Sequence, residues 1–124
     1  MVESAFVLPV ALSLIMGTII AGLGVFRYHQ LAYLAREGSR WASVRGPTYQ
    51  TDQNASPATA SDVMAGAVTP QMAGLSPSLL TSTLTWNTAA SPPTVTFKLT
   101  YSWVPEAILP STTFTSTSTQ IITY

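Results

Sequence analysis

One uncharged, apolar stretch near the N-terminus, residues 5–26, constrains this sequence most. It contains 22 residues, and twelve of them are Leu, Ile, Val or Phe. A helix needs about 20 such residues to cross the hydrocarbon core of a bilayer, and the twelve large side chains together favour insertion by roughly 4–7 kcal/mol. The stretch therefore predicts a helix that lies in a membrane or among other apolar helices.

A secretory signal peptide is the alternative interpretation of this stretch. Signal peptides have a shorter apolar region, about 7–15 residues, which follows a basic segment. Here Glu3 precedes the stretch, neither Lys nor Arg does, and the stretch continues into Arg27 and Tyr28. We therefore expect a helix that is retained in the protein.

The residues after the apolar stretch continue the helical pattern. Residues 26–45 contain no Pro, and small or apolar side chains recur every three or four positions through Leu31, Leu34, Gly38 and Trp41. The helix is expected to stop at residues 46–47, where Gly is followed by Pro. One helix from about residue 4 to 45 would be about 63 Å long. Because that is about twice the thickness of a bilayer core, its second half must lie outside a membrane.

Beyond the helix the chain becomes rich in Thr and Ser. Residues 47–60 are expected to form an exposed loop. Residues 61–75 open with Ser61 and Asp62, which suit a helix cap, and predict a short helix that Pro70 interrupts.

The last 45 residues have the alternating pattern of strands. Apolar and polar side chains alternate over residues 80–86 and 94–103, and residues 87–93 supply a turn, so this pair predicts an antiparallel hairpin. Residues 112–124 are rich enough in β-branched side chains for a third strand. The expected fold class is α+β: a long N-terminal helix, then a small head with a short helix and an antiparallel sheet of about three strands.

We accordingly divide the chain into two parts. Residues 1–45 form the long helix, with an apolar core or membrane part at 1–26 and an amphipathic part at 27–45. Residues 46–124 form a Thr/Ser-rich globular head. The stripe through Leu31, Leu34, Gly38 and Trp41 is the expected cover for the apolar face of the sheet.

The charge content excludes several classes of function. Only 8% of the residues are charged and the net charge is zero, whereas an average soluble domain is about 25% charged. A nucleic-acid-binding protein needs a basic surface, which this composition lacks. The single His and the absence of Cys leave neither a metal-ligand set nor a thiol nucleophile. We expect no enzyme activity, no cofactor and no metal site.

Two segments of the predicted helix carry a family resemblance. Residues 2–10 read VESAFVLPV and residues 34–46 read LAREGSRWASVRG. They resemble the start and the end of the N-terminal helix of TadE-like pilins, the subunits of tight-adherence pili. The resemblance rests on the following residues: Glu3, Pro9, Ala35, Arg36, Gly38, Arg40 and Trp41.

The resemblance implies a subunit of a type IV pilus-like filament on a bacterial or archaeal surface. Such a subunit is anchored in the inner membrane, trimmed by a prepilin peptidase and assembled with its own copies by the pilus machinery. Glu3 would then neutralise the amino terminus of a neighbouring subunit, and Pro9 would mark a point where the helix could unwind. A plain helix N-terminal acid is the alternative for Glu3. In this family processing leaves the Glu at the fifth position, whereas here it is the third, so the processed terminus stays open.

Three further sets of residues are candidates for contacts. Gly17, Ala21, Gly22 and Gly24 form a small-residue patch that permits close helix packing, although Gly is common in membrane helices anyway. Residues 27–45 have a net charge of +3, and their Arg36 and Arg40, with Gly38 and Trp41, would contact the head or other subunits. The acidic partners considered are Asp52, Asp62 and Glu106, and the alternative is a solvated surface beside lipid phosphates. Asn54 begins an Asn-Ala-Ser sequon, a possible glycosylation site or a chance match.

Other functions remain open from the sequence. The chain could be a low-copy minor pseudopilin or accessory protein that primes or caps a pilus. It could also be a membrane-tethered adhesin that uses aromatic residues of its head.

Overall fold

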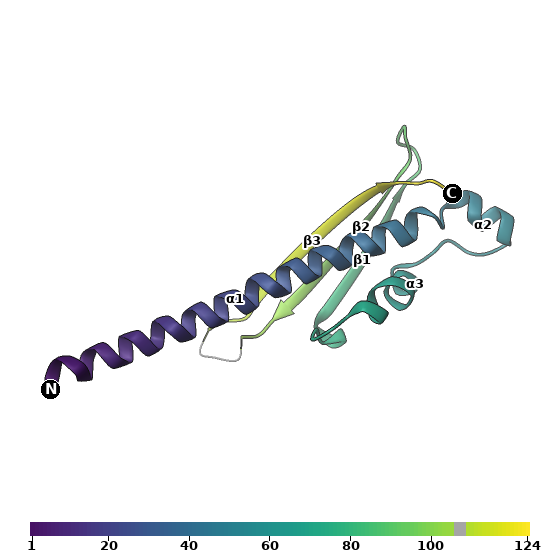
Figure 1. The fold of residues 1–124 in the computed structure, drawn as a ribbon. Coiled ribbons are helices and arrows are strands. Elements are labelled where there is room, and N and C mark those ends of the chain that lie inside the picture. The colour runs from purple at the N-terminus through teal and green to yellow at the C-terminus, as the bar shows by residue number, and fades with distance from the viewer. Residues whose placement is uncertain (106–108) are drawn as a thin grey trace.

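The computed structural model describes residues 1–105 and 109–124. One long helix, α1 (Val2–Ser43), runs through most of the molecule, and the remainder of the chain packs against its C-terminal half (Figure 1). The chain has the α+β fold predicted from the sequence, because this helix is followed by a head with short helices and a three-stranded antiparallel sheet. We use "head" for residues 46–105 and 109–124.

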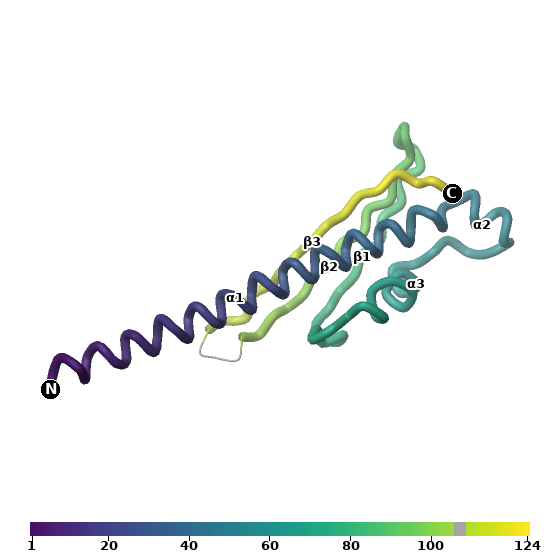
Figure 2. Tube along the Cα trace, viewed as in Figure 1, coloured from purple at the N-terminus to yellow at the C-terminus, as the bar shows by residue number. Residues whose placement is uncertain are grey.

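Helix α1 is continuous through Pro9, and its bounds differ from the predicted ones by two residues at each end. The last carbonyls of a helix have no partner within it. At this end the chain itself supplies partners, because the backbone N–H groups of Thr123 and Tyr124 donate to the Ser43 carbonyl at 3.0 and 3.3 Å. Figure 2 shows the C-terminus beside the junction between α1 and the next helix.

Helix α2 (Pro47–Gln53) occupies a segment that the sequence predicted as loop, and that prediction is wrong for these seven residues. Pro47 takes the first helical position, where its missing N–H would have had no partner in any case. Asn54 ends the helix in the left-handed conformation, with φ of 54°, which Asn tolerates better than most residues. The Pro and Asn that suggested a loop instead mark the two ends of a short, mostly exposed helix.

The short, interrupted helix predicted after this region is present in three pieces: α3 (Ala60–Val63), the π-helix η1 (Met64–Val68) and the 3-10 helix η2 (Thr69–Gln71). Its cap is Thr59, not the predicted Ser61 and Asp62. The Thr59 hydroxyl accepts from the Asp62 N–H, and the Asp62 carboxylate accepts from the Thr59 N–H at 2.8 Å. This is a reciprocal capping box. Pro70 lies in η2, beyond the α-helical turn, where its missing N–H is tolerated.

The sheet has the strand order β1–β2–β3, with both pairs antiparallel. A further 3-10 turn, η3 (Pro77–Leu79), leads into β1 (Leu80–Asn87), which is followed by β2 (Thr94–Trp103) and β3 (Thr112–Ile121). Phe97 lies opposite Leu84 on one side and Ser118 on the other. The alternation in the sequence therefore predicted β1 and β2, and the β-branched residues predicted β3, although β3 ends before the predicted residue 124.

One face of the sheet forms the core and the other is polar. Helix α1 packs across β2 and β3, while α3 and η1 lie against α1, and α3 also contacts β1. The largest fully buried apolar side chains come from α1, α3, η1 and β2: Leu31, Leu34, Val63, Val68, Val95, Phe97 and Leu99. The opposite face presents mainly threonines, of which Thr96 and Thr119 form a cross-strand hydroxyl hydrogen bond of 2.9 Å.

Candidate functional site

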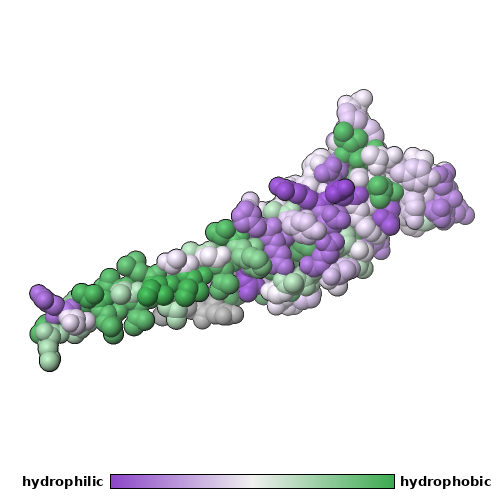
Figure 3. Space-filling view, viewed as in Figure 1, coloured by the Kyte–Doolittle hydropathy of each residue, from purple (hydrophilic) through white to green (hydrophobic). Residues whose placement is uncertain are grey.

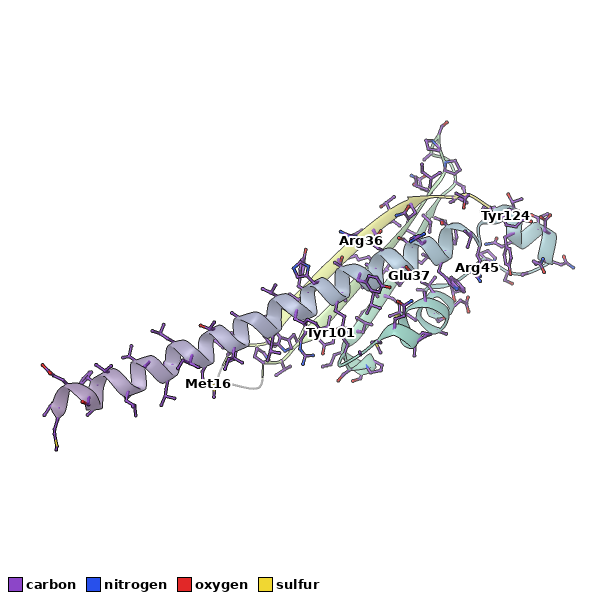
Figure 4. The ribbon with its side chains drawn as sticks, viewed as in Figure 1. Met16, Arg36, Glu37, Arg45, Tyr101 and Tyr124 are labelled. Atoms are coloured by element: carbon purple, nitrogen blue, oxygen red, sulfur yellow. The ribbon has the colours of Figure 1, made fainter. Side chains whose placement is uncertain are left out.

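The apolar N-terminal half of α1 is the surface with the clearest functional character. We call residues 2–23 the stem, and all of them are exposed apart from the half-buried Ile20. In Figure 3 the stem is an apolar rod beside a more polar head, and Figure 4 shows Met16 projecting from it. By length and composition α1 can cross a membrane. Residues 2–23 rise by about 33 Å, which matches the roughly 30 Å hydrocarbon core of a bilayer.

The hydroxyl groups of the stem are compatible with an apolar environment. The Ser13 hydroxyl donates to the Pro9 carbonyl and the Thr18 hydroxyl donates to the Leu14 carbonyl, each at 2.8 Å. Such bonds within one helix satisfy the donors without water. Glu3 differs from these residues, because it lies exposed in the first turn and is the only charged side chain among residues 1–26. A buried stem therefore needs a partner for this carboxylate.

The small residues of the stem region separate into two groups. A Cβ added to Gly24 would lie 3.0 Å from the Trp103 ring, so Gly24 allows the head to approach its own helix. Among the described residues, a Cβ added to Gly17 or Gly22 would meet nothing within 4 Å. Ala21 is exposed like these two. Gly24 is thus used within the chain, and the other three are accessible to a second helix.

Gly38 brings α1 close to the centre of the sheet. A Cβ at this position would lie 2.5 Å from two atoms of the Phe97 ring and 3.1 Å from Val63. These distances are shorter than normal van der Waals contacts. Any larger residue here would therefore push the helix from the sheet or displace the buried ring.

Ser39 joins the same interface by a polar contact that the sequence did not reveal. Its buried hydroxyl donates to the Arg36 carbonyl and lies 2.8 Å from the Ser118 hydroxyl of β3. The run of small residues Gly38, Ser39, Ala42 and Ser43 on one side of α1 is the signal that could have indicated this contact. A buried hydroxyl is tolerated here because it has a partner.

The basic side chains of the amphipathic half have different surroundings. Arg36 and Arg40 are exposed, and Figure 4 shows Arg36 and Glu37 extending from different sides of α1. Arg45 lies 3.8 Å above the Trp41 ring and donates to the Trp41 carbonyl at 3.2 Å. The Trp41 ring also packs on the backbone at Gly66, where an added Cβ would lie 2.7 Å from it. Trp41 thus holds the η1 segment and one arginine, whereas Arg36 and Arg40 are available to other molecules.

Two of the acidic groups considered as arginine partners have other contacts in this chain. The Asp62 carboxylate accepts from the N–H and the hydroxyl of Thr59, and these hydrogen bonds lower its pKa below the ordinary value. Asp52 accepts a hydrogen bond from the Tyr124 hydroxyl, and this bond, with the charge of Asp52, raises the pKa of Tyr124. Glu106 lies outside the described residues. Both described carboxylates therefore stabilise turns and the C-terminal tail of the head.

The remaining candidate residues lie at the surface. Asn54 is exposed at the end of α2, and His29 is exposed with its ring 6.2 Å from that of Tyr28. Across residues 1–105 and 109–124, no three His, Asp or Glu side chains gather in a group that could hold a metal ion.

Comparison with known proteins connects this geometry to a family. The sequence model of the family described as TadE-like protein matches residues 1–40, which cover the stem and most of the helical side of the interface with the head. No curated protein and no solved structure matches the chain. TadE-like proteins are a structural, pilus-related family, so the chain is similar to pilus-associated proteins over residues 1–40, and its apolar stem fits a membrane anchor. The resemblance to TadE-like proteins predicted from the two helix motifs is thus confirmed over residues 1–40.

Proposed function

We propose that this chain is a structural subunit of a Tad-type, type IV pilus-like filament that polymerises through its stem. The exposure of the stem carries the proposal. The head completes its own core on the second half of α1 and leaves residues 2–23 exposed, apart from the half-buried Ile20. A helix that is apolar on all sides is stable only inside lipid or among other apolar helices. Both environments are used by a subunit that is first anchored in the inner membrane and then packed into a fibre.

The energetics of such assembly favour a role for the small residues and for Glu3. Each large apolar side chain gains about 1.5–3 kcal/mol on leaving water, which keeps the stem out of solution. Moving the stem from lipid into a bundle of stems adds little of this energy, since lipid tails are equally apolar. Assembly then depends on close packing and on polar pairing. Gly17, Ala21 and Gly22 offer the close approach, and Glu3 offers a charge for the amino terminus of the neighbouring copy.

The proposal also assigns partners outside the stem. Trimming by a prepilin peptidase and export by the pilus machinery precede polymerisation. Arg36 and Arg40, exposed on the amphipathic half of α1, contact neighbouring heads once the stems are packed. The Thr-rich outer face of the sheet, which also carries the exposed Lys98, lies on the outside of the fibre at the cell surface.

The role of Glu3 is tested by Glu3→Gln in the full chain, expressed with its pilus assembly system. We expect the variant to enter the membrane as well as the native protein, because a charge has been removed, and to yield few or short filaments. Glu37→Gln is the matched control, since it removes the same charge from the half-buried surface beside the head and leaves the stem intact. Filaments of native number and length from Glu3→Gln would refute the pairing role.

Subunit stoichiometry tests the filament role itself. If the chain is the structural subunit, images of purified surface filaments will show it repeated along their whole length. A few copies per filament, or copies confined to the membrane fraction, would instead establish a low-copy minor or accessory protein. Imaging of the filaments and counting of copies in the membrane fraction both use the unmodified chain, so their results are independent of the result with Glu3→Gln.

A further inference from the structure

The end of the head nearest the stem has an aromatic cluster. The rings of Trp103 and Phe114 are stacked, with centroids 5.6 Å apart, and the Tyr28 ring meets Phe114 edge-on at 6.2 Å. Gly24 lets the Trp103 ring lie directly on the backbone of α1. We call Tyr28, Trp103 and Phe114 the aromatic collar.

Apolar side chains close to the collar in the sequence are exposed. Val104 is 58% exposed and Leu109 is 53% exposed, and both belong to the segment that connects β2 to β3. Phe26 on α1, two residues before Tyr28, is 64% exposed. The apolar surface of the stem therefore continues onto the end of the head nearest the stem.

The position of the collar along α1 matches the edge of a bilayer. From Val2 to Gly24 the helix rises by about 33 Å, so a stem that spans a hydrocarbon core of about 30 Å brings the collar to the level of the lipid headgroups. The order of residues along the helix agrees with this level, because the first cationic side chain, Arg27, and the first ring of the collar, Tyr28, follow the apolar stretch directly. Trp and Tyr are enriched at this level in membrane proteins, since their rings are apolar and their N–H or O–H groups are polar.

Arg27 strengthens the match to a membrane surface. Its guanidinium donates to the Gly74 carbonyl at 3.0 Å and to the Tyr101 hydroxyl at 3.3 Å, and the side chain is only half-buried. The head thus holds a cation at the height of the collar, where lipid phosphates would lie.

We propose that the aromatic collar docks the head onto the headgroup region of a lipid bilayer when the stem spans it. The partner is the lipid surface and not a further protein, and the contact fixes the depth and tilt of the subunit before assembly. This inference rests on the membrane-anchored state in the proposed function and is independent of whether the protein later forms the body of a filament.

Depth-dependent fluorescence quenching tests the docking. The full chain is reconstituted into phosphatidylcholine and phosphatidylglycerol vesicles that contain lipids brominated either near the headgroup or near the bilayer centre. We expect strong quenching of the native protein by the shallow quencher and weaker quenching by the deep one. Trp103→Phe should lose most of the quenching, whereas Trp86→Phe should retain it. Trp86 pairs with Val95 near the start of β2, and Trp103 is the last residue of that strand, so the two rings lie at opposite ends of the sheet.

A second pair of variants leaves all tryptophans in place. Val104→Asp puts a charge on the exposed apolar surface beside the collar and should reduce shallow quenching of Trp103. Ile121→Asp puts the same charge on an exposed apolar position at the far end of β3 and should leave quenching unchanged. Vesicle flotation without quenching of Trp103 would overturn the docking and leave the membrane anchor standing. Failure to float with vesicles would overturn both the docking and the anchor, and filament stoichiometry tests the fibre separately.

Discussion

Replacing Gly38 by Ala tests the closest contact between α1 and the sheet. The added Cβ would lie 2.5 Å from two atoms of the buried Phe97 ring, about 1 Å inside a normal carbon–carbon contact. Overpacking of this kind costs about 1–3 kcal/mol. Alanine gains about 1 kcal/mol over glycine inside a helix, which offsets part of the cost.

The difference is a loss of up to about 2 kcal/mol in the free energy of unfolding of the head for Gly38→Ala. The unfolding midpoint should fall by up to roughly 10 °C. The assay is thermal unfolding of the full chain in mild detergent, followed by near-UV circular dichroism of the aromatic side chains in the head. Gly17→Ala is the matched control, because within the described structure its Cβ meets nothing within 4 Å, and it should not destabilise the protein.

A double-mutant cycle shows whether Phe97 is the cause. In a Phe97→Leu background the ring is absent, so Gly38→Ala should cost less than in the native chain by more than about 0.5 kcal/mol, the usual limit of additivity. The reasoning fails if Gly38→Ala is as stable as Gly17→Ala. It also fails if the cost of Gly38→Ala is unchanged when Phe97 is replaced.

Two further predictions concern polar contacts of the head. Ser39→Ala should lower the free energy of unfolding by about 1 kcal/mol. The double variant Ser39→Ala with Ser118→Ala should cost less than the sum of the two single changes, because both remove the same 2.8 Å contact. Equal and additive losses of the free energy of unfolding in urea would contradict a shared bond. The hydrogen bonds from Thr59 lower the pKa of Asp62 in the folded state, so they stabilise the head at neutral pH. This contribution is lost as the pH falls through the lowered pKa, which lies below the ordinary aspartate pKa of about 3.9. Asp62→Asn should therefore be less stable than the native chain at neutral pH and equal to it in acid, and a difference that persists in acid would refute the assignment.

The order of elements could be read from the sequence because each depends on local patterns. Residues 5–26 are apolar at every helical angle, residues 94–103 alternate with period two, and Gly46 followed by Pro47 stops a helix. These patterns state which sides of a segment avoid water, and that is sufficient to assign a long helix, strands and their pairing in a hairpin. The same reasoning failed for α2, since the local signals of a loop and of short helix ends are the same residues.

The roles of individual small residues depended on the tertiary structure. The sequence placed Gly38 on the stripe that faces the sheet, but Gly17, Gly22 and Gly24 look alike in it. In the described structure Gly24 admits a ring of the head, while Gly17 and Gly22 lie free on the stem. Which glycine faces which ring depends on the angle at which α1 crosses β2 and β3, and that angle follows from the packing of all the side chains between them.

The partners of polar side chains also emerged only from the folded chain. Arginines and carboxylates attract each other in any arrangement, so the sequence made Asp52 and Asp62 candidate partners of Arg36 and Arg40, within the chain or between subunits, with a solvated surface as the alternative. In the structure the two carboxylates bond to Tyr124 and Thr59, which are near them in the fold. By itself the sequence determined that this chain has an apolar stem, a long helix and a β-sheet head, because the spacing of apolar residues along the chain indicates which sides of each segment are buried. The tertiary structure alone decided which atoms meet, because close contacts depend on distances between segments far apart in the chain.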